Sequence, residues 1–484
     1  MKVLKNILYK VTLETVVGDT GININTIQFD SRKIDANDVF IAIRGHVVDG
    51  HDYIESALNK GASAVIVEEL PNDFRDNVTY LKVSDSSIAL AIMASNYYES
   101  PSENLKLIGV TGTNGKTTIA SLLYELFKKA GYKVGLISTV KIIINDTVYE
   151  STHTTPDSLA INQFLHKMNV EGVEFCFMEV SSHGIHQNRT KGLHFLGGIF
   201  TNLSHDHLDY HETFSEYRDV KKMFFDELPS SSFSLVNADD KNGLFMLQNT
   251  SSKTHTYALK TIADYRARIL ENQFNGLLLN INGNEVWTKL IGNFNAYNVL
   301  AIYGTANLLG LESSEVLRLL SELESVRGRF QYLISNNITA IVDYAHTPDA
   351  LKNVLETINS IRTKNEELIT VVGCGGDRDK TKRPKMANIA SALSSKVIFT
   401  SDNPRTELPE QIIQEMEIGV APQNFKKTLS ITDRKQAIHT ACQLAQPHDI
   451  ILVAGKGHET YQEINGTRNS FDDYKILETY LKNI

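Results

Sequence analysis

The segment from residue 105 to residue 131 constrains the fold more than any other part of this chain of 484 residues. Residues 105–110, LKLIGV, form an apolar run typical of a buried strand, and the glycine-rich stretch TGTNGKTT follows at residues 111–118. Residues 119–131 then show the apolar spacing of an amphipathic helix that ends at Gly131. A strand, a glycine-rich loop and a helix in this order predict a phosphate-binding unit.

The loop carries the groups that bind a nucleoside triphosphate. Gly112 and Gly115 let backbone N–H groups approach phosphate oxygens, Lys116 supplies a cation, and Thr117 offers a hydroxyl to Mg²⁺. The strict pattern G-x-x-x-x-G-K-[ST] is not matched, because its first glycine would fall at Val110. A glycine-rich turn without a ligand is the alternative interpretation. The expected ATP contacts are Gly112, Thr113, Asn114, Gly115, Lys116, Thr117 and Thr118.

Composition excludes several other classes of protein. Hydrophobic residues make up 42% of the chain and charged residues 22%, as in folded globular proteins. The net charge of −9 comes from scattered acidic residues, so we expect neither nucleic-acid binding nor membrane insertion. Three widely spaced cysteines suit a reducing compartment, and no long apolar run indicates a signal peptide or a membrane span. The expected location is the cytoplasm.

The length predicts about three domains, at roughly 150 residues each. Residues 97–105 are polar and contain Pro101, which indicates a linker, and the pattern changes again near residue 333. The predicted domains are therefore residues 1–102, 103–333 and 334–484. The first has an α/β pattern, with strands expected at 38–43 and 62–69 and a helix at 53–61.

The third predicted domain alternates strands with helices. Strands are expected at 339–344, 368–373, 396–401 and 449–455, and helices at 349–361 and 386–394. This alternation predicts a parallel sheet of βαβ units, in which ligands bind beyond the carboxyl ends of the strands. Residues 373–384 follow one such strand and combine a glycine-rich turn with four basic side chains, which suggests an anion pocket that includes Arg378.

Three further residues are candidates for metal chemistry. Glu179 follows an apolar stretch, so its carboxylate is expected at a strand end near the phosphate loop, although SSH after it could simply cap a helix. His207 lies in HDHLDYH, whose density of histidine and aspartate favours a metal or phosphate site over structural histidines. Lys221 stands beside Lys222 in a helical segment, a pattern that more often marks a solvated helix face.

The phosphate loop TGTNGKTT resembles the variant loop of the Mur ligases and of folylpolyglutamate synthetase, and the likeness to the Mur ligases extends from Asp30 to Glu459. It is strongest to members that add a diamino acid to UDP-N-acetylmuramoyl-L-alanyl-D-glutamate. The resemblance implies an α/β fold of three domains: an N-terminal uridine-binding domain, a central P-loop ATPase-like domain with a parallel sheet, and a C-terminal Rossmann-like domain.

The resemblance also implies roles for the candidate metal residues. It assigns a second Mg²⁺ to His207, with Asp206 and Asp209 as supporting groups, and it matches Lys221 to a carbamylated lysine whose added carboxylate supports that ion. The implied metal ligands are then Thr117, Glu179, His207 and carbamylated Lys221, and the implied catalytic residues are Lys116, Glu179, His207 and Lys221.

For ATP, the resemblance implies adenine contacts from Asn295 and Asn298, and ribose-side or hinge groups at Arg329, Asp343 and His346. Helix capping by the asparagines, a surface ion pair of Arg329 and a strand-end cap at Asp343 are the structural alternatives. For the UDP-muramoyl peptide, the implied contacts lie in FDSRK, RGHVVDGH, HTTPDS and HGIHQNRT, and they are Ser31, His46, Thr154, Thr155, Ser182, Gln187 and Arg189.

The amino-acid site is implied by DNPR at 402–405 and AGKGHE at 454–459. DNPR resembles the pattern of enzymes that add meso-diaminopimelate, whereas lysine-adding enzymes commonly lack this arginine. Arg405 would hold the distal carboxylate and Glu459 the distal ammonium. An ion pair of Arg405 with Glu407 or Glu410 is the alternative. The implied contacts are Arg378, Asp402, Asn403, Arg405, Gly455 and Glu459.

Together these features imply an ATP-dependent ligase of peptidoglycan precursor synthesis. ATP would convert the D-glutamate side-chain carboxylate into an acyl phosphate, and the amine of meso-diaminopimelate would attack it. An L-lysine-adding ligase and a folylpolyglutamate synthetase are the alternatives within ligases, although the latter would not need the N-terminal domain. A P-loop NTPase without ligase activity is the alternative from another class.

Overall fold

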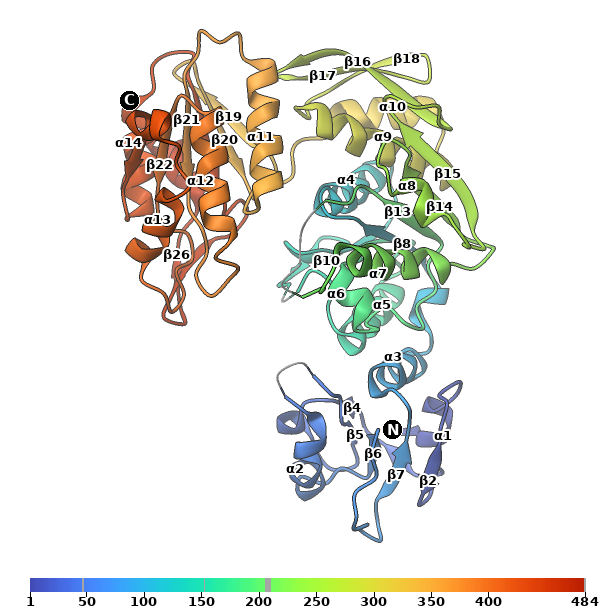
Figure 1. The fold of residues 1–484 in the computed structure, drawn as a ribbon. Helices are drawn as coiled ribbons and strands as arrows, with labels where there is room; N and C mark the ends of the chain where they lie inside the picture. The colour runs from blue at the N-terminus through green and yellow to red at the C-terminus, as the bar shows by residue number, and fades with distance from the viewer. Residues whose placement is uncertain (46–47, 152, 205–209, 483–484) are drawn as a thin grey trace.

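The computed structural model describes residues 1–45, 48–151, 153–204 and 210–482. The chain folds into three successive α/β parts, each with its own main sheet (Figure 1). This arrangement confirms the expected fold class. The main sheets occupy residues 15–82, 106–288 and 331–454. The exact boundaries at 102 and 333 stay a prediction, and one strand, β19 (Gln331–Ser335), crosses the second of them.

The N-terminal part contains a sheet in the order β2-β7-β6-β5-β4, parallel except for β2. The expected strands at 38–43 and 62–69 are confirmed as β5 and β6, and the expected helix as α2. Asp85 caps the last helix of this part by accepting from the N–H groups of Ser87 and Ile88. The elements are β1 (Lys2–Val3), α1 (Leu4–Ile7), β2 (Thr15–Val17), β3 (Asn23–Ile24), β4 (Ile27–Gln28), β5 (Val39–Ile41), α2 (Ile54–Asn59), β6 (Ala64–Val67), β7 (Thr79–Lys82) and α3 (Ser86–Tyr97).

The central part is built on an 11-stranded sheet in the order β11-β10-β9-β12-β8-β13-β14-β15-β16-β17-β18. Its strands are β8 (Lys106–Thr111), β9 (Val134–Ile137), β10 (Ile142–Ile144), β11 (Thr147–Tyr149), β12 (Phe175–Glu179), β13 (Gly197–Phe200), β14 (Phe233–Asn237), β15 (Lys253–Ala258), β16 (Tyr265–Gln273), β17 (Gly276–Ile281) and β18 (Asn284–Thr288). Its helices are α4 (Lys116–Lys129), α5 (Ser158–Val170), α6 (Ser182–His186), α7 (Phe214–Asp226), α8 (Gly243–Met246), α9 (Asn293–Leu308) and α10 (Ser313–Glu322).

The strands from β9 to β16 in this order run parallel, and their carboxyl ends form one edge. Apolar residues of α4, α9 and α10 pack on one face, and those of α5 and α7 belong to a second core on the other. The expected strand–loop–helix unit is confirmed, but the helix begins at Lys116 rather than at residue 119. Gly115 has φ 91°, and this left-handed conformation turns the chain directly into the first helical turn.

The C-terminal part has a sheet in the order β19-β20-β24-β21-β22-β23, and the four expected strands are its parallel centre. Helices α11, α12 and α13 pack on one face, and α14 and α15 on the other. The elements are β19 (Gln331–Ser335), β20 (Ile338–Asp343), α11 (Pro348–Ile361), β21 (Leu368–Val372), α12 (Lys382–Leu393), β22 (Lys396–Phe399), α13 (Pro409–Glu417), β23 (Thr428–Ser430), α14 (Arg434–Leu444), β24 (Ile450–Ala454), β25 (Tyr461–Ile464), β26 (Thr467–Ser470) and α15 (Asp473–Leu481).

No helix within the described residues is long and apolar enough to cross a membrane.

Candidate active site

The phosphate loop lies between β8 and α4, at the carboxyl edge of the central sheet. The Lys116 ammonium folds back over the loop and donates to the carbonyl oxygens of Gly112 at 2.9 Å and Thr113 at 2.8 Å. The segment that follows β13 also fixes the loop, because the Asn114 N–H donates to Asn202 Oδ1 at 3.0 Å. These hydrogen bonds hold the backbone in the shape of an anion-binding loop.

Glycine is required at two positions of this loop by space as well as by conformation. A Cβ on Gly112, whose φ is 141°, would lie 1.9 Å from the Thr201 hydroxyl oxygen. A Cβ on Gly115 would lie 2.8 Å from Asn298 Oδ1. Asn298 thus reaches the phosphate loop from α9, which the linear sequence does not reveal.

Glu179 is completely buried at the end of β12, beside the phosphate loop. Its Oε2 accepts from the Thr117 hydroxyl at 2.9 Å and from the Thr139 hydroxyl at 3.2 Å, and its Oε1 accepts from the Thr139 N–H at 2.7 Å. These donors are all neutral, so the buried carboxylate is hydrogen-bonded but not neutralised by them. Ser181 does cap α6, as the SSH sequence allowed, but Glu179 before it is buried beside the phosphate loop.

The oxygen atoms of Glu179 and Thr117 suit a hard cation such as Mg²⁺. Mg²⁺ prefers oxygen ligands and is commonly bound through one or two carboxylates together with substrate phosphates. Thr117 and Glu179 provide a hydroxyl and a carboxylate in contact, next to a loop shaped for phosphate. No group of three or more His, Cys, Asp or Glu side chains in the described part of the chain forms a complete metal site. Thr117 and Glu179 therefore fit an ion that phosphate oxygens of the substrate also coordinate.

Lys221 lies in α7 with its side chain directed into the protein. Only 1% of its surface is exposed, and Nζ donates to the Gly112 carbonyl at 2.9 Å. The interpretation of Lys221 and Lys222 as a solvated helix face is wrong, because both are buried and Lys222 pairs with Asp226 along the helix. His207, Asp206 and Asp209 lie outside the described residues, as does His46.

A second polar cluster adjoins Glu179 and contains several of the expected substrate residues. The Thr155 hydroxyl donates to the Glu179 carbonyl at 2.9 Å, and the Thr155 carbonyl accepts from Arg189 Nη1 at 2.6 Å. Arg189 also donates to Gln187 Oε1, at 2.6 Å and 3.0 Å. Thr154 belongs to the same cluster, since its hydroxyl oxygen lies 3.0 Å from that of Thr139.

Two other expected substrate residues are placed less directly. Ser182 is buried at the start of α6, and no hydrogen-bond partner of its hydroxyl lies within the described residues. Ser31 is buried at the start of a short 3₁₀ helix in the N-terminal part, where Lys60 donates to its carbonyl at 3.0 Å. No contact brings Ser31 to the central cluster in the part of the chain that the structure covers.

The asparagines of α9 do not cap the helix. Asn298 Nδ2 donates to Asn295 Oδ1 at 2.8 Å, and Asn295 Nδ2 donates to the Ile291 carbonyl at 2.8 Å. The N-cap residue is Gly292, and no side chain caps this helix end. The capping alternative is therefore wrong, and the two amides form a chain that leads toward the phosphate loop.

Arg329 and Asp343 lie where the third part of the chain begins. Arg329 stacks on the Tyr344 ring, 4.6 Å from its centroid, and Nη2 donates to the Thr117 hydroxyl at 3.2 Å. Asp343 Oδ2 accepts from the Phe330 N–H at 2.7 Å. Burial raises the pKa of Asp343 to about 6, although the charge of Arg329 acts in the opposite direction. His346 is exposed and contacts the Tyr344 carbonyl at 2.8 Å.

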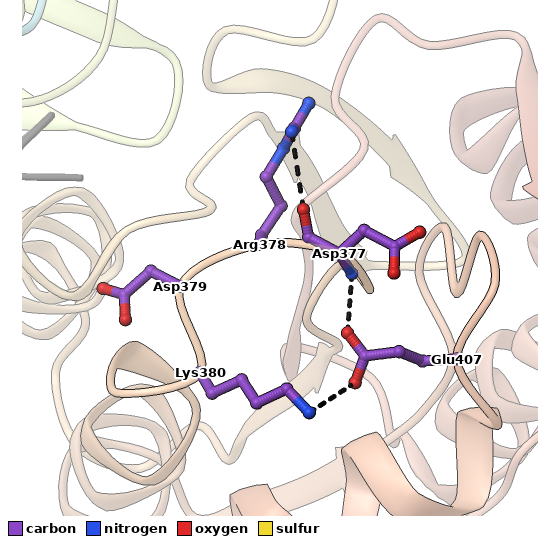
Figure 2. A pocket seen from close by; sticks show the side chains of 5 residues that line it. All are labelled: Asp377, Arg378, Asp379, Lys380 and Glu407. Atoms are coloured by element: carbon purple, nitrogen blue, oxygen red, sulfur yellow. Dashed lines mark hydrogen bonds and ion pairs between the residues drawn. The ribbon is translucent and has the colours of Figure 1, made fainter. Parts of the chain in front are cut away.

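The turn after β21 lines a pocket of about 450 Å³ with Asp377, Arg378, Asp379, Lys380 and Glu407 (Figure 2). The charge of this region differs from that of the expected anion pocket, because carboxylates pair with some of its basic side chains. Arg383 is fully buried and pairs with Glu407 at 2.9 Å and Glu415 at 2.6 Å, and Lys380 pairs with Glu407 at 3.2 Å. Only some of the four basic side chains can therefore serve an anion. Figure 2 shows Arg378 extending away from Glu407, so it remains a candidate.

The DNPR and GKGHE segments meet beyond the ends of β22 and β24. Asn403 Nδ2 donates to Glu459 Oε2 at 2.8 Å, and Gly455 allows close packing, because a Cβ there would lie 2.5 Å from Asp402 Oδ2. Arg405 donates to the Gly376 carbonyl at 2.6 Å and lies 3.9 Å from Glu463. The alternative pairing of Arg405 with Glu407 or Glu410 is not found among the described residues.

Arg405 also has an uncommon backbone conformation, with φ 51°. A left-handed conformation at a residue other than glycine, asparagine or aspartate costs free energy and persists where the surroundings enforce it. Hydrogen bonds to β25 supply this restraint, since the Arg405 N–H donates to the Glu463 carbonyl at 3.1 Å and the Arg405 carbonyl accepts from Asn465 at 2.8 Å.

Several residues of these clusters have no signal in the sequence that would single them out. Thr139, in the turn after β9, contacts Glu179, and Asn202 fixes the phosphate loop. Lys456 is fully buried and donates to both Asn403 and Glu459. Lys456 at least lies within AGKGHE, which the resemblance assigns to the amino-acid site, whereas Thr139 and Asn202 lie outside every motif named for the resemblance.

Comparison with known proteins assigns all three parts of the chain to one family. Residues 23–98 match the Mur ligase family catalytic domain, residues 110–306 the Mur ligase middle domain, and residues 328–457 the Mur ligase glutamate ligase domain. A UDP-N-acetylmuramoyl-L-alanyl-D-glutamate–2,6-diaminopimelate ligase from Cytophaga hutchinsonii is 54% identical over 480 residues, which cover 99% of each chain.

Solved structures agree with this assignment. A structure of a UDP-N-acetylmuramoyl-L-alanyl-D-glutamate–2,6-diaminopimelate ligase has a TM-score of 0.71 at 32% identity, over 100% of this chain and 99% of the other. The MurF ligase of Thermotoga maritima in complex with ADP has a TM-score of 0.62 at 19% identity, over 95% and 98% of the chains, and shows likeness of fold alone. The identity and full-length coverage show that this chain belongs to the Mur ligase family of ATP-dependent amide ligases.

Proposed function

We propose that this enzyme adds meso-diaminopimelate to the D-glutamate side-chain carboxylate of UDP-N-acetylmuramoyl-L-alanyl-D-glutamate, in the cytoplasmic stage of peptidoglycan precursor synthesis. The observation that carries the proposal is the contact of Asn403 with Glu459, close in the chain to Arg405, whose guanidinium binds the Gly376 carbonyl in the turn after β21. A guanidinium and a carboxylate held on rigid loops match the distal carboxylate and ammonium of a diamino diacid. The 54% identical relative carries a name with the same activity.

In the proposed reaction, the phosphate loop and Lys116 bind the ATP phosphates, and Asn295 and Asn298 contact the adenine. Arg329, Asp343 and His346 act on the ribose side of the nucleotide. The γ-phosphoryl group passes to the substrate carboxylate, giving an acyl phosphate and ADP. The free amine of diaminopimelate then attacks the acyl carbon and expels inorganic phosphate, so that an amide forms. The enzyme acts chiefly by positioning three reactants.

We propose that Thr117 and Glu179 hold a Mg²⁺ ion at the phosphate loop, and that His207 and carbamylated Lys221 hold a second. Bound Mg²⁺ reduces the repulsion between the substrate carboxylate and the triphosphate. The contact of Thr117 with Glu179 and the burial of Lys221 beside Gly112 support these assignments. Ser31, His46, Thr154, Thr155, Ser182, Gln187 and Arg189 are the proposed contacts to the UDP-muramoyl peptide.

A product assay tests the proposal. Purified enzyme is incubated with UDP-N-acetylmuramoyl-L-alanyl-D-glutamate, ATP and Mg²⁺, together with either meso-diaminopimelate or L-lysine. Mass spectrometry then identifies the product by its mass. We expect ADP release to require both the carboxylate and the amine substrates. Release of ADP without either would favour an NTPase, and efficient addition of L-lysine would contradict the proposed specificity while leaving the ligase reaction intact.

A further inference from the structure

Lys456 is a fully buried cation inside the proposed amino-acid site. It lies in the turn after β24, between Gly455 and Gly457, with none of its surface exposed. Its Nζ donates to Asn403 Oδ1 at 2.7 Å and to Glu459 Oε2 at 3.1 Å. Because a buried charge without a partner is costly, these two contacts fix where the ammonium lies.

Asn403 completes a closed triangle with this pair. Its Oδ1 accepts from Lys456, and its Nδ2 donates to the same Glu459 oxygen at 2.8 Å. The Glu463 N–H also donates to Asn403 Oδ1, at 3.0 Å, which fixes the orientation of the amide. Both side-chain donors therefore reach Oε2 of Glu459, and no donor within the described residues contacts Oε1. That oxygen is left to accept from a ligand.

The charges around Glu459 explain why a cation is needed. Burial raises the pKa of Glu459, and the Asp402 carboxylate raises it further, whereas Lys456 and Asn403 lower it. Arg434 also faces this group, but it is engaged with the buried carboxylate of Asp473 at 2.7 Å. Tyr344 and Tyr461 are further titratable neighbours of Glu459. Lys456 is thus the cation in direct contact with Glu459, and its charge lowers the pKa that burial and Asp402 raise.

We propose that Lys456 is a positioning residue that sets specificity: it holds the Glu459 carboxylate charged and aimed, so that the site selects amino acids with a second, distal ammonium group. The inference rests on the proposed function, because Glu459 is taken to contact the distal ammonium of diaminopimelate. Lys456 itself does not touch the substrate. Without the Lys456 ammonium, Glu459 and Asp402 share one buried region without a cation in contact, and the pKa of Glu459 rises further.

The test compares meso-diaminopimelate with 2-aminopimelate, which keeps both carboxylates and the attacking amine but lacks the distal amine. In the wild-type enzyme we expect kcat/KM to favour diaminopimelate by about a hundredfold or more at pH 7, the scale of an unpaired buried charge. In Lys456→Met this preference should fall to about tenfold or less at pH 7 and recover as the pH is raised, because a higher pH favours the ionised form of Glu459. The KM values for ATP and the UDP-muramoyl peptide should stay unchanged.

Two further variants make the result decisive. Lys352→Met, an exposed position on α11, is the matched control and should keep the wild-type preference at every pH. The double variant Lys456→Met/Glu459→Gln removes both buried charges, so it folds without an unpaired ion if the single variant does not. If Lys456 acts only through Glu459, the double variant and Glu459→Gln alone should show the same low preference at all pH values.

Three results would overturn the inference: an unchanged preference in Lys456→Met, a loss of preference that does not recover at high pH, or a further loss in the double variant beyond Glu459→Gln. Failure of the proposed function itself looks different, since the wild-type enzyme would then not ligate diaminopimelate.

Discussion

The side chains of Lys116 and Lys221 meet at one atom: each Nζ lies 2.9 Å from the carbonyl oxygen of Gly112. One lysine belongs to the first turn of α4, and the other reaches the same carbonyl from α7, across the phosphate loop. Two ammonium groups on one acceptor repel each other, so their arrangement favours the binding of a polyanion between them. Addition of a carbamate to Lys221 would reverse the charge of one member of the pair.

Lys116→Ala should lower the rate of ligation by more than about a hundredfold, because Lys116 stabilises charge on the transferring phosphoryl group. ADP release in the complete reaction mixture measures the effect. Lys128→Ala is the matched control: it lies at the other end of α4, is exposed, and pairs with Asp146. A folded Lys116→Ala enzyme with near-normal turnover would contradict the nucleotide site.

If Lys221 carries a carbamate, Lys221→Ala should lose most activity and regain part of it in the presence of acetate or formate. The added carboxylate would then take the place of the missing carbamate beside the metal. Lys222→Ala, the buried neighbour that pairs with Asp226, should show no such rescue. Full activity of Lys221→Ala, or equal rescue of both variants, would rule out the carbamate.

The raised pKa of Asp343 predicts a specific dependence of stability on pH. Its pKa is about 6 in the folded protein against the ordinary value of 3.8, so the folded state holds the proton where the unfolded state has lost it. This carboxyl group therefore lowers the free energy of unfolding as the pH rises between these values, and adds nothing further above about pH 7. Between pH 4.5 and pH 7.5, the free energy of unfolding of Asp343→Asn should therefore rise by about 2 kcal/mol relative to that of the wild-type protein.

Chemical denaturation at the two pH values measures this difference, and Asp73→Asn, at an exposed loop position, is the control that should show none. A constant difference between Asp343→Asn and wild type across the range would mean that Asp343 titrates as it does in water.

Local patterns predicted the phosphate loop and the parallel strands correctly because the residues that form them are adjacent in the sequence. Contacts over long separations were not predictable. The sequence GCGGDRDKTKRP does not distinguish Arg383 from Arg378 as an anion-binding residue. In the structure, Arg383 is buried against Glu407 and Glu415, which are 24 and 32 residues away. Thr139 is 40 residues from Glu179 and carries no motif. The chain pattern around Lys221 suggested solvent exposure, whereas α7 packs that face against the phosphate loop.

Gly457 packs against the linker that joins the second and third parts of the chain, and replacement by alanine should be costly there. A Cβ at Gly457 would lie 2.6 Å from Tyr344 Cβ and 2.8 Å from the Gly328 carbonyl oxygen, and its φ is 53°. Gly466 has a φ of 76°, and a Cβ there would meet no atom within 4 Å, so Gly466→Ala isolates the cost of the backbone conformation. We expect about 1 kcal/mol of destabilisation for Gly466→Ala and at least about 2 for Gly457→Ala. Equal shifts in thermal midpoint would contradict the close approach.

Arg405→Ala should lower kcat/KM for meso-diaminopimelate by about a hundredfold or more, because it removes the charged partner of a buried carboxylate. The effect should fall on this substrate alone, since Arg405 contacts Gly376 and Glu463 and lies apart from the phosphate loop. Arg405→Lys should recover little, because an ammonium cannot form two parallel hydrogen bonds to a carboxylate.

Competition between meso-diaminopimelate and L-lysine at equal concentration measures the specificity. The control is Arg318→Ala, at a surface residue of α10 that pairs with Glu322. L-lysine lacks the distal carboxylate and would meet the guanidinium with a like charge, so the wild-type enzyme should yield almost only the diaminopimelate product. If Arg405→Ala kept that preference, recognition of the distal carboxylate would have to come from another group, such as Arg378.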